Sequence, residues 1–509
     1  MNSILRSSLL SKYGMFGAVA LALPACEVRW DESDPMGRDR RSAGTFLDTP
    51  ASSAGSANSP GVRNGRVRDP SAPALDPPPQ SPRPEGSASP PAPALSSAPA
   101  AARGEGAPAA PSALPSPSST PARASDVAAS LLYRDLIVTS PEVVGSRRAS
   151  NSEEHAPWSF RTQMQWLAGA GREPAEFTRA WLEQWSSVSS VGPAAAPVAP
   201  RSHVGALLID PWLADASPAP ERGATPGSYA APASGPRWDR APFRLIAIVN
   251  RVDLASDPCT GFAGELRYIY AALDATSGAP LRMTVIFELP YPTTRSAADW
   301  ARAWSALANE SGDDYAARLE LLTAEVAADA DPLRARVRTN EAALAAGPES
   351  DWELREFTLE LQGGALALVQ APLEFTPRSD VDPGELAQYV LDHADAVRAA
   401  GAALPDEMRA GASSIPSAGF RWPLLGVSEG LRQAFNLQTC NGCHGGASAT
   451  LPFQHVAAPA DWSSPAQLSR FLYDPDADSD ELERRSDVQY RLSAASCTPA
   501  SEAPGYSGR

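Results

Sequence analysis

The run FRLIAIV occupies residues 243–249, near the middle of the chain. It is short, apolar and rich in β-branched residues, which is typical of a buried strand. Further β-like runs follow at 265–270, 282–289, 352–361 and 365–369, the last of them after a Gly-Gly turn. Long helical stretches do not separate each run from the next, and this favours antiparallel over parallel pairing. The sequence therefore predicts an α+β fold with a mainly antiparallel central sheet.

Helices are expected to flank this sheet. Pro174 suits a helix start, and Phe177, Trp181 and Trp185 then recur at helical spacing. Such a stripe is typical of core packing, with a cofactor wall as the alternative. His393 lies on the apolar stripe of another expected helix, which favours a buried, hydrogen-bonded histidine. The other helical patterns cover residues 315–328, 383–400, 428–437, 465–473 and 480–492.

Charge and composition argue against nucleic-acid and nucleotide partners. The net charge of −16 is the wrong sign for a phosphate backbone. Lys12 is the single lysine, which excludes a P-loop from the rest of the chain. The tetrapeptide 250–253, Asn-Arg-Val-Asp, is similar to a guanine-reading motif, but without a phosphate loop it indicates a turn at a strand end. Asp253 is expected to cap that turn or to pair with Arg251.

The C-terminal part contains the one stretch that points to a specific chemistry, FNLQTCNGCHGG at residues 435–446. Its centre is Cys-x-x-Cys-His, the pattern of covalent haem attachment. Thiols at Cys440 and Cys443 share one side of a helical turn, where they can add to two vinyl groups of a porphyrin. The imidazole of His444 then becomes the proximal iron ligand. The sequence predicts haem c, bound through these three residues.

Three other interpretations of the motif stay open. Cys440 and Cys443 can form a structural disulfide, which an exported protein favours. They can act as a thioredoxin-like redox pair, although no βαβ context surrounds them. They can provide half of a zinc site, although no second Cys-x-x-Cys exists in the chain.

The N-terminus has the features of an export signal. Arg6 and Lys12 precede a short apolar run at residues 15–23, and Leu-Pro-Ala-Cys ends it at Cys26. That ending resembles a bacterial lipobox, whose cysteine becomes lipidated. The alternative interpretation is an ordinary signal peptide in which Cys26 is incidental. We therefore expect the protein to be attached to a membrane through a lipid anchor. Its expected location is the cell envelope, on the periplasmic or outer surface.

The predicted organisation has four parts. Residues 1–25 form a signal peptide, and residues 26–126 form a disordered tether rich in Pro, Ala and Ser. Residues 127–400 form the α+β domain, and residues 401–509 form a helical, cytochrome c-like segment. Two cysteines are left over, and Cys259 and Cys497 are candidates for a disulfide in an oxidising compartment.

From Trp158 onward the chain resembles a family of uncharacterised exported proteins and lipoproteins of myxobacteria. The resembling stretches are 181–185, 243–254, 264–270, 338–341, 352–357, 420–423, 435–446 and 453–456. The resemblance implies one continuous architecture and carries no activity with it. A narrower resemblance, over residues 435–446 alone, is to class I cytochromes c.

The sixth iron ligand departs from the pattern of those cytochromes. They carry a methionine downstream of the motif, whereas the last methionine here is Met408, upstream of it. His455 is the only downstream histidine and therefore the candidate second ligand of the iron. The alternative is that His455 is simply a buried residue beside Phe453. The leading hypothesis is an exported electron carrier with an unknown redox partner. The alternative is a non-enzymatic envelope or interaction lipoprotein, and no constellation of catalytic residues supports an enzyme.

Overall fold

The computed structural model describes residues 132–214, 237–275, 277–342, 352–415, 420–447, 454–474 and 481–497. These residues all belong to one compact unit, on both sides of the predicted boundary at residue 400. The predicted signal peptide, Cys26 and the predicted tether lie outside the described residues.

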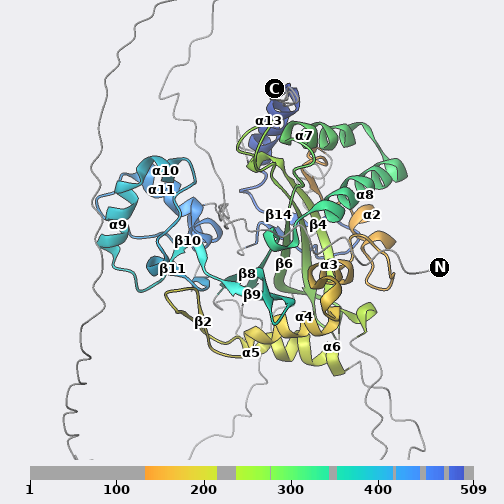
Figure 1. The fold of residues 1–509 in the computed structure, drawn as a ribbon, viewed down its shortest axis with the longest axis horizontal. Coiled ribbons are helices and arrows are strands. Elements are labelled where there is room, and N and C mark those ends of the chain that lie inside the picture. Colours follow the sequence, from red (N-terminus) through yellow and green to blue (C-terminus); the bar gives the residue numbers. More distant parts are fainter. Residues whose placement is uncertain are drawn as a thin grey trace, which may run out of the picture. The chain divides into compact units, whose positions relative to one another are not determined.

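A central antiparallel sheet organises the fold (Figure 1). Its order is β1–β4–β5–β6–β7–β8–β12, and β9 also pairs with β8. Every pairing in it is antiparallel. The α+β class with a mainly antiparallel sheet and flanking helices is thereby confirmed. The strands are β1 (Ile137–Val138), β4 (Phe243–Arg251), β5 (Glu265–Leu273), β6 (Pro280–Pro290), β7 (Arg336–Ala342), β8 (Trp352–Gln362), β9 (Ala365–Ala371) and β12 (Ser413–Ile415).

Five of these strands, β4, β5, β6, β8 and β9, coincide with the predicted β-like runs. Strand β7 was not predicted from its pattern. Its sequence, RVRTNEA, contains only two apolar residues, yet six of its seven residues are buried. Its polar side chains are accommodated because neighbouring strands supply opposite charges, a property of the tertiary structure.

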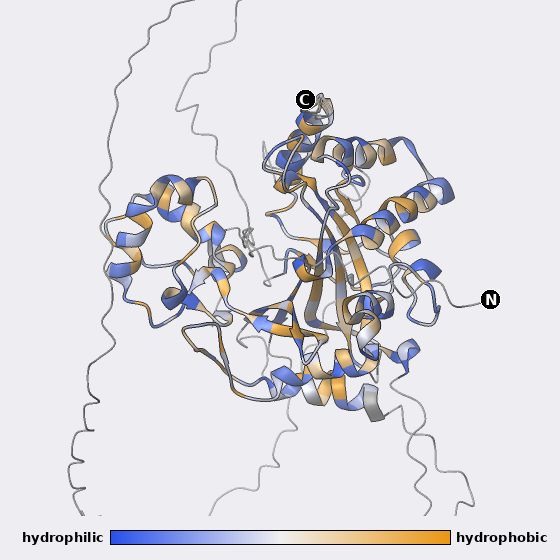
Figure 2. Cartoon of the chain, viewed as in Figure 1, coloured by the Kyte–Doolittle hydropathy of each residue, from blue (hydrophilic) through white to orange (hydrophobic). Residues whose placement is uncertain are grey.

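One face of the sheet forms the main hydrophobic core. Alternate residues along the strands point there, including Ile248, Tyr268, Phe287, Val337 and Phe357, all at most 1% exposed. Figure 2 shows the hydrophobic colour concentrated on the strands and on the helix faces. The helices that contribute to this core are α2 (Pro141–Val144), α3 (Phe160–Ala168), α4 (Pro174–Leu182), α5 (Ser202–Val204), α6 (Asp210–Ala214), α7 (Ala297–Ser305) and α8 (Gly312–Asp329).

The tryptophan stripe belongs to this core. Trp181 and Trp185 are 1% exposed, and their rings contact each other and Phe357 edge-on or tilted. The core-packing interpretation is confirmed. A small ribbon pairs β2 (Ser189–Val191) with β3 (Ala196–Val198) and lies between α4 and α5 along the chain.

The opposite face of the sheet is covered by C-terminal residues. Val249 and Ile269 on the sheet form a second apolar cluster with Val456, Leu468 and Leu472. The covering segment pairs β13 (Val456–Ala457) with β14 (Gln467–Leu468). The predicted helix at 465–473 is therefore wrong, because packing onto the sheet favours this short ribbon over the local amphipathic pattern.

A helical group packs around its own apolar cluster. It contains α9 (Pro383–Asp392), α10 (Ala394–Arg398) and α11 (Glu429–Gln438), next to the ribbon of β10 (Leu373–Pro377) and β11 (Arg409–Ala410). The expected helix at 383–400 is interrupted at His393, which has non-helical backbone angles. His393 is exposed, so its assignment as a core histidine is wrong. Its Nδ1 does lie 2.9 Å from the main-chain carbonyl oxygen of Tyr389.

Helix α13 (Glu481–Ala494) ends the described chain and returns to the sheet and α7. Gln489 on α13 accepts a hydrogen bond from Asn250 at 2.6 Å and donates one to Asp135 at 2.7 Å. A disulfide joins Cys259 to Cys497, with 5.3 Å between their Cα atoms, as the two leftover cysteines suggested. Among the helices that the structure describes, none is both long and apolar enough to cross a bilayer.

Candidate functional site

The Cys-x-x-Cys-His motif follows helix α11 directly. A short helical turn, α12 (Cys440–Gly442), leads into a π-helical turn at Cys443–Ala447. The Thr439 hydroxyl accepts a hydrogen bond from the Gly442 N–H, which caps the turn. A Cβ at Gly442 would lie 2.4 Å from the Asn436 carbonyl oxygen, so this tight reversal requires glycine. The reversal carries the motif from the helical group toward the sheet.

The two thiols of the motif face different surroundings. Both cysteines are buried and both are thiols, so the structure contradicts the alternative of a Cys440–Cys443 disulfide. Cys440 packs with Trp352 and Leu354 and lines a small cavity of about 10 Å³. Cys443 Sγ lies 3.4 Å from His455 Nε2. The sulfurs therefore sit against separate partners.

The two histidines lie side by side. The ring centroids of His444 and His455 are 4.4 Å apart, and the His444 ring stacks on Trp352 at 5.0 Å. His455 Nδ1 is 3.1 Å from Ser469 Oγ, which orients the ring. Burial, the neighbouring His444 and nearby arginines lower the pKa of His455 well below its usual value, so its imidazole is neutral at pH 7.

Both imidazoles line a cavity of about 80 Å³ between the sheet and the C-terminal segment. This is well below the ~300–1,000 Å³ usual for small-molecule and cofactor sites. Much of its wall is apolar, with contributions from Val249, Ile269, Ile286, Leu354, Phe471 and Leu472. The wall and the imidazoles together provide a hydrophobic slot with two nitrogen donors.

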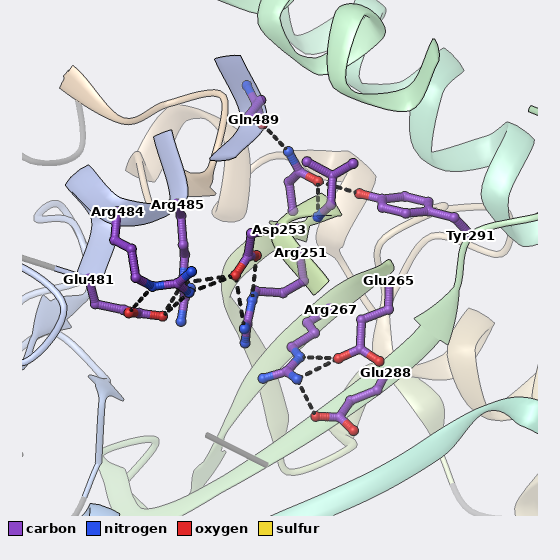
Figure 3. A network of polar contacts seen from close by, with 12 residues as sticks. Arg251, Asp253, Glu265, Arg267, Glu288, Tyr291, Glu481, Arg484, Arg485 and Gln489 are labelled. Carbon is purple, nitrogen blue, oxygen red and sulfur yellow. Dashed lines mark hydrogen bonds and ion pairs between the residues drawn. The ribbon is translucent and has the colours of Figure 1, made fainter. Parts of the chain in front are cut away.

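The floor of the cavity is a row of alternating charges on the sheet. Arg267 pairs with Glu265 at 2.5 Å and with Glu288 at 3.2 Å. Arg338 pairs with Glu288 and with Glu356, both at 2.9 Å. These side chains lie on neighbouring strands and are almost fully buried. Figure 3 shows Arg267 lying between Glu265 and Glu288.

A second cluster closes the cavity at α13 (Figure 3). Arg251 binds Asp253 through two hydrogen bonds of 2.8 and 3.2 Å, which confirms the expected pairing. Arg484 binds the same carboxylate at 2.9 Å, and Glu481 binds both Arg484 and Arg485 at 2.8 Å. Three guanidinium groups thus share two carboxylates.

The cavity contains features that fit an occupant. Asn340 is 3% exposed and lines the cavity, yet its Oδ1 has no hydrogen-bond partner in the described part of the chain. A buried acceptor without a partner costs free energy that a bound molecule or water recovers. Four arginines and two glutamates line the cavity, so its charged lining favours an anionic occupant.

The residue types around the cavity suit haem, but the volume of the cavity and the positions of the two thiols do not. The imidazoles suit an iron ligand pair, the apolar wall suits a flat macrocycle, and the arginines suit its propionates. The Cys443 sulfur lies 3.4 Å from His455 Nε2, but Cys443 is not among the residues that line the cavity. Cys440 does not line this cavity: it lines the smaller one, and Arg338 borders both. Two thioethers therefore require Cys440 to move past Arg338.

A zinc site receives no such support. No group of three or more Cys, His, Asp and Glu side chains within the described ranges has the arrangement of a metal site. The charged floor, in contrast, was missed by the sequence analysis. Its signal is the occurrence of arginine and glutamate at alternate positions of strands that are otherwise apolar, as at Glu265 and Arg267.

Comparison with protein families, with curated proteins and with solved structures finds no match to this chain.

Proposed function

We propose that this chain is an exported, lipid-anchored protein that binds one haem covalently and transfers electrons. The supporting observation is that His444 of the attachment motif and His455 line one cavity. Cys440 and Cys443 would form the thioethers, His444 would bind the iron, and His455 would be the second ligand. When bound, the haem would supply one-electron redox chemistry.

The chain's own residues would prepare this site before the cofactor arrives. Trp352 and Ser469 hold the two imidazoles by stacking and by a hydrogen bond. The apolar residues Leu354 and Phe471 exclude water from the same cavity. A low-polarity surrounding and imidazole ligands are among the levers that set the potential of a haem.

Intact mass tests the proposal directly. The full chain is produced in a strain that attaches haem, and the purified protein is analysed by mass spectrometry, haem staining and the pyridine haemochrome spectrum. Covalent haem adds one fixed mass, and the haemochrome band position counts the thioethers. A colourless protein with the unmodified mass from a competent strain would end the proposal.

Single variants separate the roles of the two thiols. Cys443→Ser is expected to abolish attachment, because its sulfur lies beside His455, which lines the cavity. Cys440→Ser is expected to leave one thioether, because Cys440 faces the smaller cavity. Equal loss with both variants would show instead that the motif rearranges as a unit when the cofactor binds.

The lipid anchor is tested separately at Cys26, which lies outside the described residues. Fractionation of cells that make the full chain is expected to place it in the membrane fraction, and Cys26→Ser is expected to release it. Recovery of the unaltered chain in the soluble fraction would exclude the anchor.

A further inference from the structure

The side-chain amide of Asn340 lies in the middle of the sheet, where it has an unused hydrogen-bond acceptor. Asn340 belongs to β7, is 3% exposed and lines the cavity. Its Oδ1 accepts no hydrogen bond from any residue that the structure describes. Buried polar atoms are nearly always paired, because an unpaired one has lost its hydrogen bonds to water without replacement. A molecule that donates a hydrogen bond to this oxygen would therefore be stabilised here.

Thr284 places a second polar group beside this amide. It lies directly opposite Asn340 on the neighbouring strand β6, is 2% exposed and lines the same cavity. Side chains of directly opposite residues share a face of the sheet, with their Cβ atoms about 5 Å apart. The Thr284 hydroxyl can both donate and accept a hydrogen bond. An amide and a hydroxyl thus meet at one place on the cavity wall.

The charged floor next to Asn340 contains as many arginines as glutamates. It is one chain of ion pairs formed by Arg267, Arg336, Arg338, Glu265, Glu288 and Glu356. The other two arginines of the cavity lining, Arg251 and Arg485, belong to the cluster at α13. A charged ligand beside Asn340 would disturb a balanced and buried set of charges, so this end of the cavity favours a neutral ligand.

The volume of the cavity limits the ligand to a small group. It is about 80 Å³. A water molecule takes up ~30 Å³ in the liquid, so about three or four non-hydrogen atoms fit. The apolar residues Ile286 and Leu354 line the same cavity, and Leu354 lies directly opposite Asn340 on β8. The ligand must therefore combine a small polar group with a short apolar part.

A primary carboxamide group combines these properties. It is uncharged, and it carries both N–H donors and a carbonyl acceptor. Its N–H can donate to Asn340 Oδ1, while its carbonyl oxygen accepts from the Asn340 amide or from the Thr284 hydroxyl. Because both amides carry a donor and an acceptor, the match holds for either orientation of the Asn340 amide.

We propose that Asn340 and Thr284 form a binding site for the primary carboxamide group of a small neutral molecule, with Ile286 and Leu354 as its apolar wall. The site goes beyond the proposed function, because it uses neither thiol of the Cys-x-x-Cys-His motif and requires no haem.

Three probes of equal size test this site on the full chain purified without attached haem. Acetamide, acetone and acetate have the same number of non-hydrogen atoms, but acetone lacks the N–H donors and acetate is charged. Binding is measured by titration with saturation-transfer difference NMR on the methyl signal of each probe. Acetamide is expected to bind with a Kd of about 1 mM, and about 10-fold or more tightly than acetone or acetate.

Variants on two neighbouring strands assign this preference to the site. Asn340→Leu is expected to weaken acetamide about 10-fold while acetone binds as before, which also shows that the cavity is intact. Thr284→Val keeps the side-chain shape, and it should reduce the preference for acetamide even where Asn340→Leu does not fold. Thr339→Val is the matched control: the Thr339 hydroxyl is also buried and unpaired within the described ranges, but Thr339 does not line this cavity. Its affinities should equal those of the unaltered protein.

Each remaining outcome would overturn the proposal. Acetone binding as tightly as acetamide would show that Asn340 recognises no donor, and tighter binding of acetate would identify an anion site instead. No binding of any probe would leave water as the occupant. A preference for acetamide that survives both Asn340→Leu and Thr284→Val would place the binding elsewhere. None of these results depends on whether haem attaches covalently, so the two proposals stand or fall separately.

Discussion

Replacing Asp253 by asparagine should strongly destabilise the folded chain. The Asp253 side chain is 2% exposed and that of Arg251 is 3% exposed. Within the described residues, the side-chain hydrogen bonds of Arg251 go to this carboxylate alone, through Nε and Nη2. Asparagine would therefore leave a buried guanidinium without its counter-charge. Breaking one partner of a buried pair costs about 3–5 kcal/mol.

The chain contains a matched control at Arg378 and Asp380. This pair has the same Arg-x-Asp spacing and the same two bonds, of 2.9 and 2.6 Å. The Asp380 side chain is, however, 64% exposed. Asp380→Asn should cost at most about 1 kcal/mol, since exposed ion pairs contribute little. The two pairs share their local geometry and differ in burial and in the further contact of Asp253 with Arg484.

The free energy of unfolding is measured for both variants by guanidinium denaturation, followed by tryptophan fluorescence and circular dichroism at pH 7. A difference of at least about 2 kcal/mol between them is expected from the two ranges above. Values for Asp253→Asn and Asp380→Asn within error of each other would refute the argument that burial determines the strength of this pair.

The same carboxylate gives a pH dependence with a defined sign. Burial alone would raise the pKa of Asp253, but Arg251, Arg485 and Arg484 outweigh it and hold the pKa well below the usual value. The stabilisation is fully present above the unfolded pKa of about 4 and is lost as the pH falls through the lower folded pKa. Between pH 4 and pH 2 the unaltered protein should lose stability more steeply than Asp253→Asn. Parallel curves would contradict this assignment.

Two further perturbations test the backbone and the disulfide. Gly264→Ala should cost about 3 kcal/mol or more, because φ is +94° and the new Cβ would lie 2.3 Å from the Arg251 carbonyl oxygen. Gly363→Ala is the control, since φ is +60° and no atom lies near its new Cβ, and it should cost about 1–2 kcal/mol. Equal denaturation midpoints for the two variants would exclude the clash. Replacing Cys259 and Cys497 by serine, which removes a link across 238 residues, should cost about 2–5 kcal/mol. A reductant should lower the midpoint of the unaltered protein by the same amount and leave the serine variant unchanged, and a reductant effect on that variant would contradict the assignment.

The difference between predicted and observed elements follows from where their stabilisation originates. Strand β4 was predicted because FRLIAIV is apolar and β-branched at almost every position, which is a local property. Strand β7 was missed because its arginines, Arg336 and Arg338, are accommodated through ion pairs with Glu356 and Glu288 of other strands. No local pattern contains that information.

The candidate site divides in the same way. The attachment motif was found from Cys440, Cys443 and His444 alone, since their spacing is itself the chemical signal. Apart from His455, the residues that surround the motif were not predicted. Trp352 lies far from His444 in sequence, yet the two rings stack because β8 and the motif meet on the face of the sheet that carries the charged floor. Arg485 reaches the cavity only because α13 returns to that face.

The sequence by itself determined the antiparallel α+β class and the attachment motif, because alternation along strands and the spacing of thiols and imidazole act over a few residues. Only the tertiary structure decided that His455, the charged floor and α13 enclose one cavity with that motif. Contacts between distant segments depend on how the whole chain packs, and burial then makes each charge in this cavity depend on its neighbour.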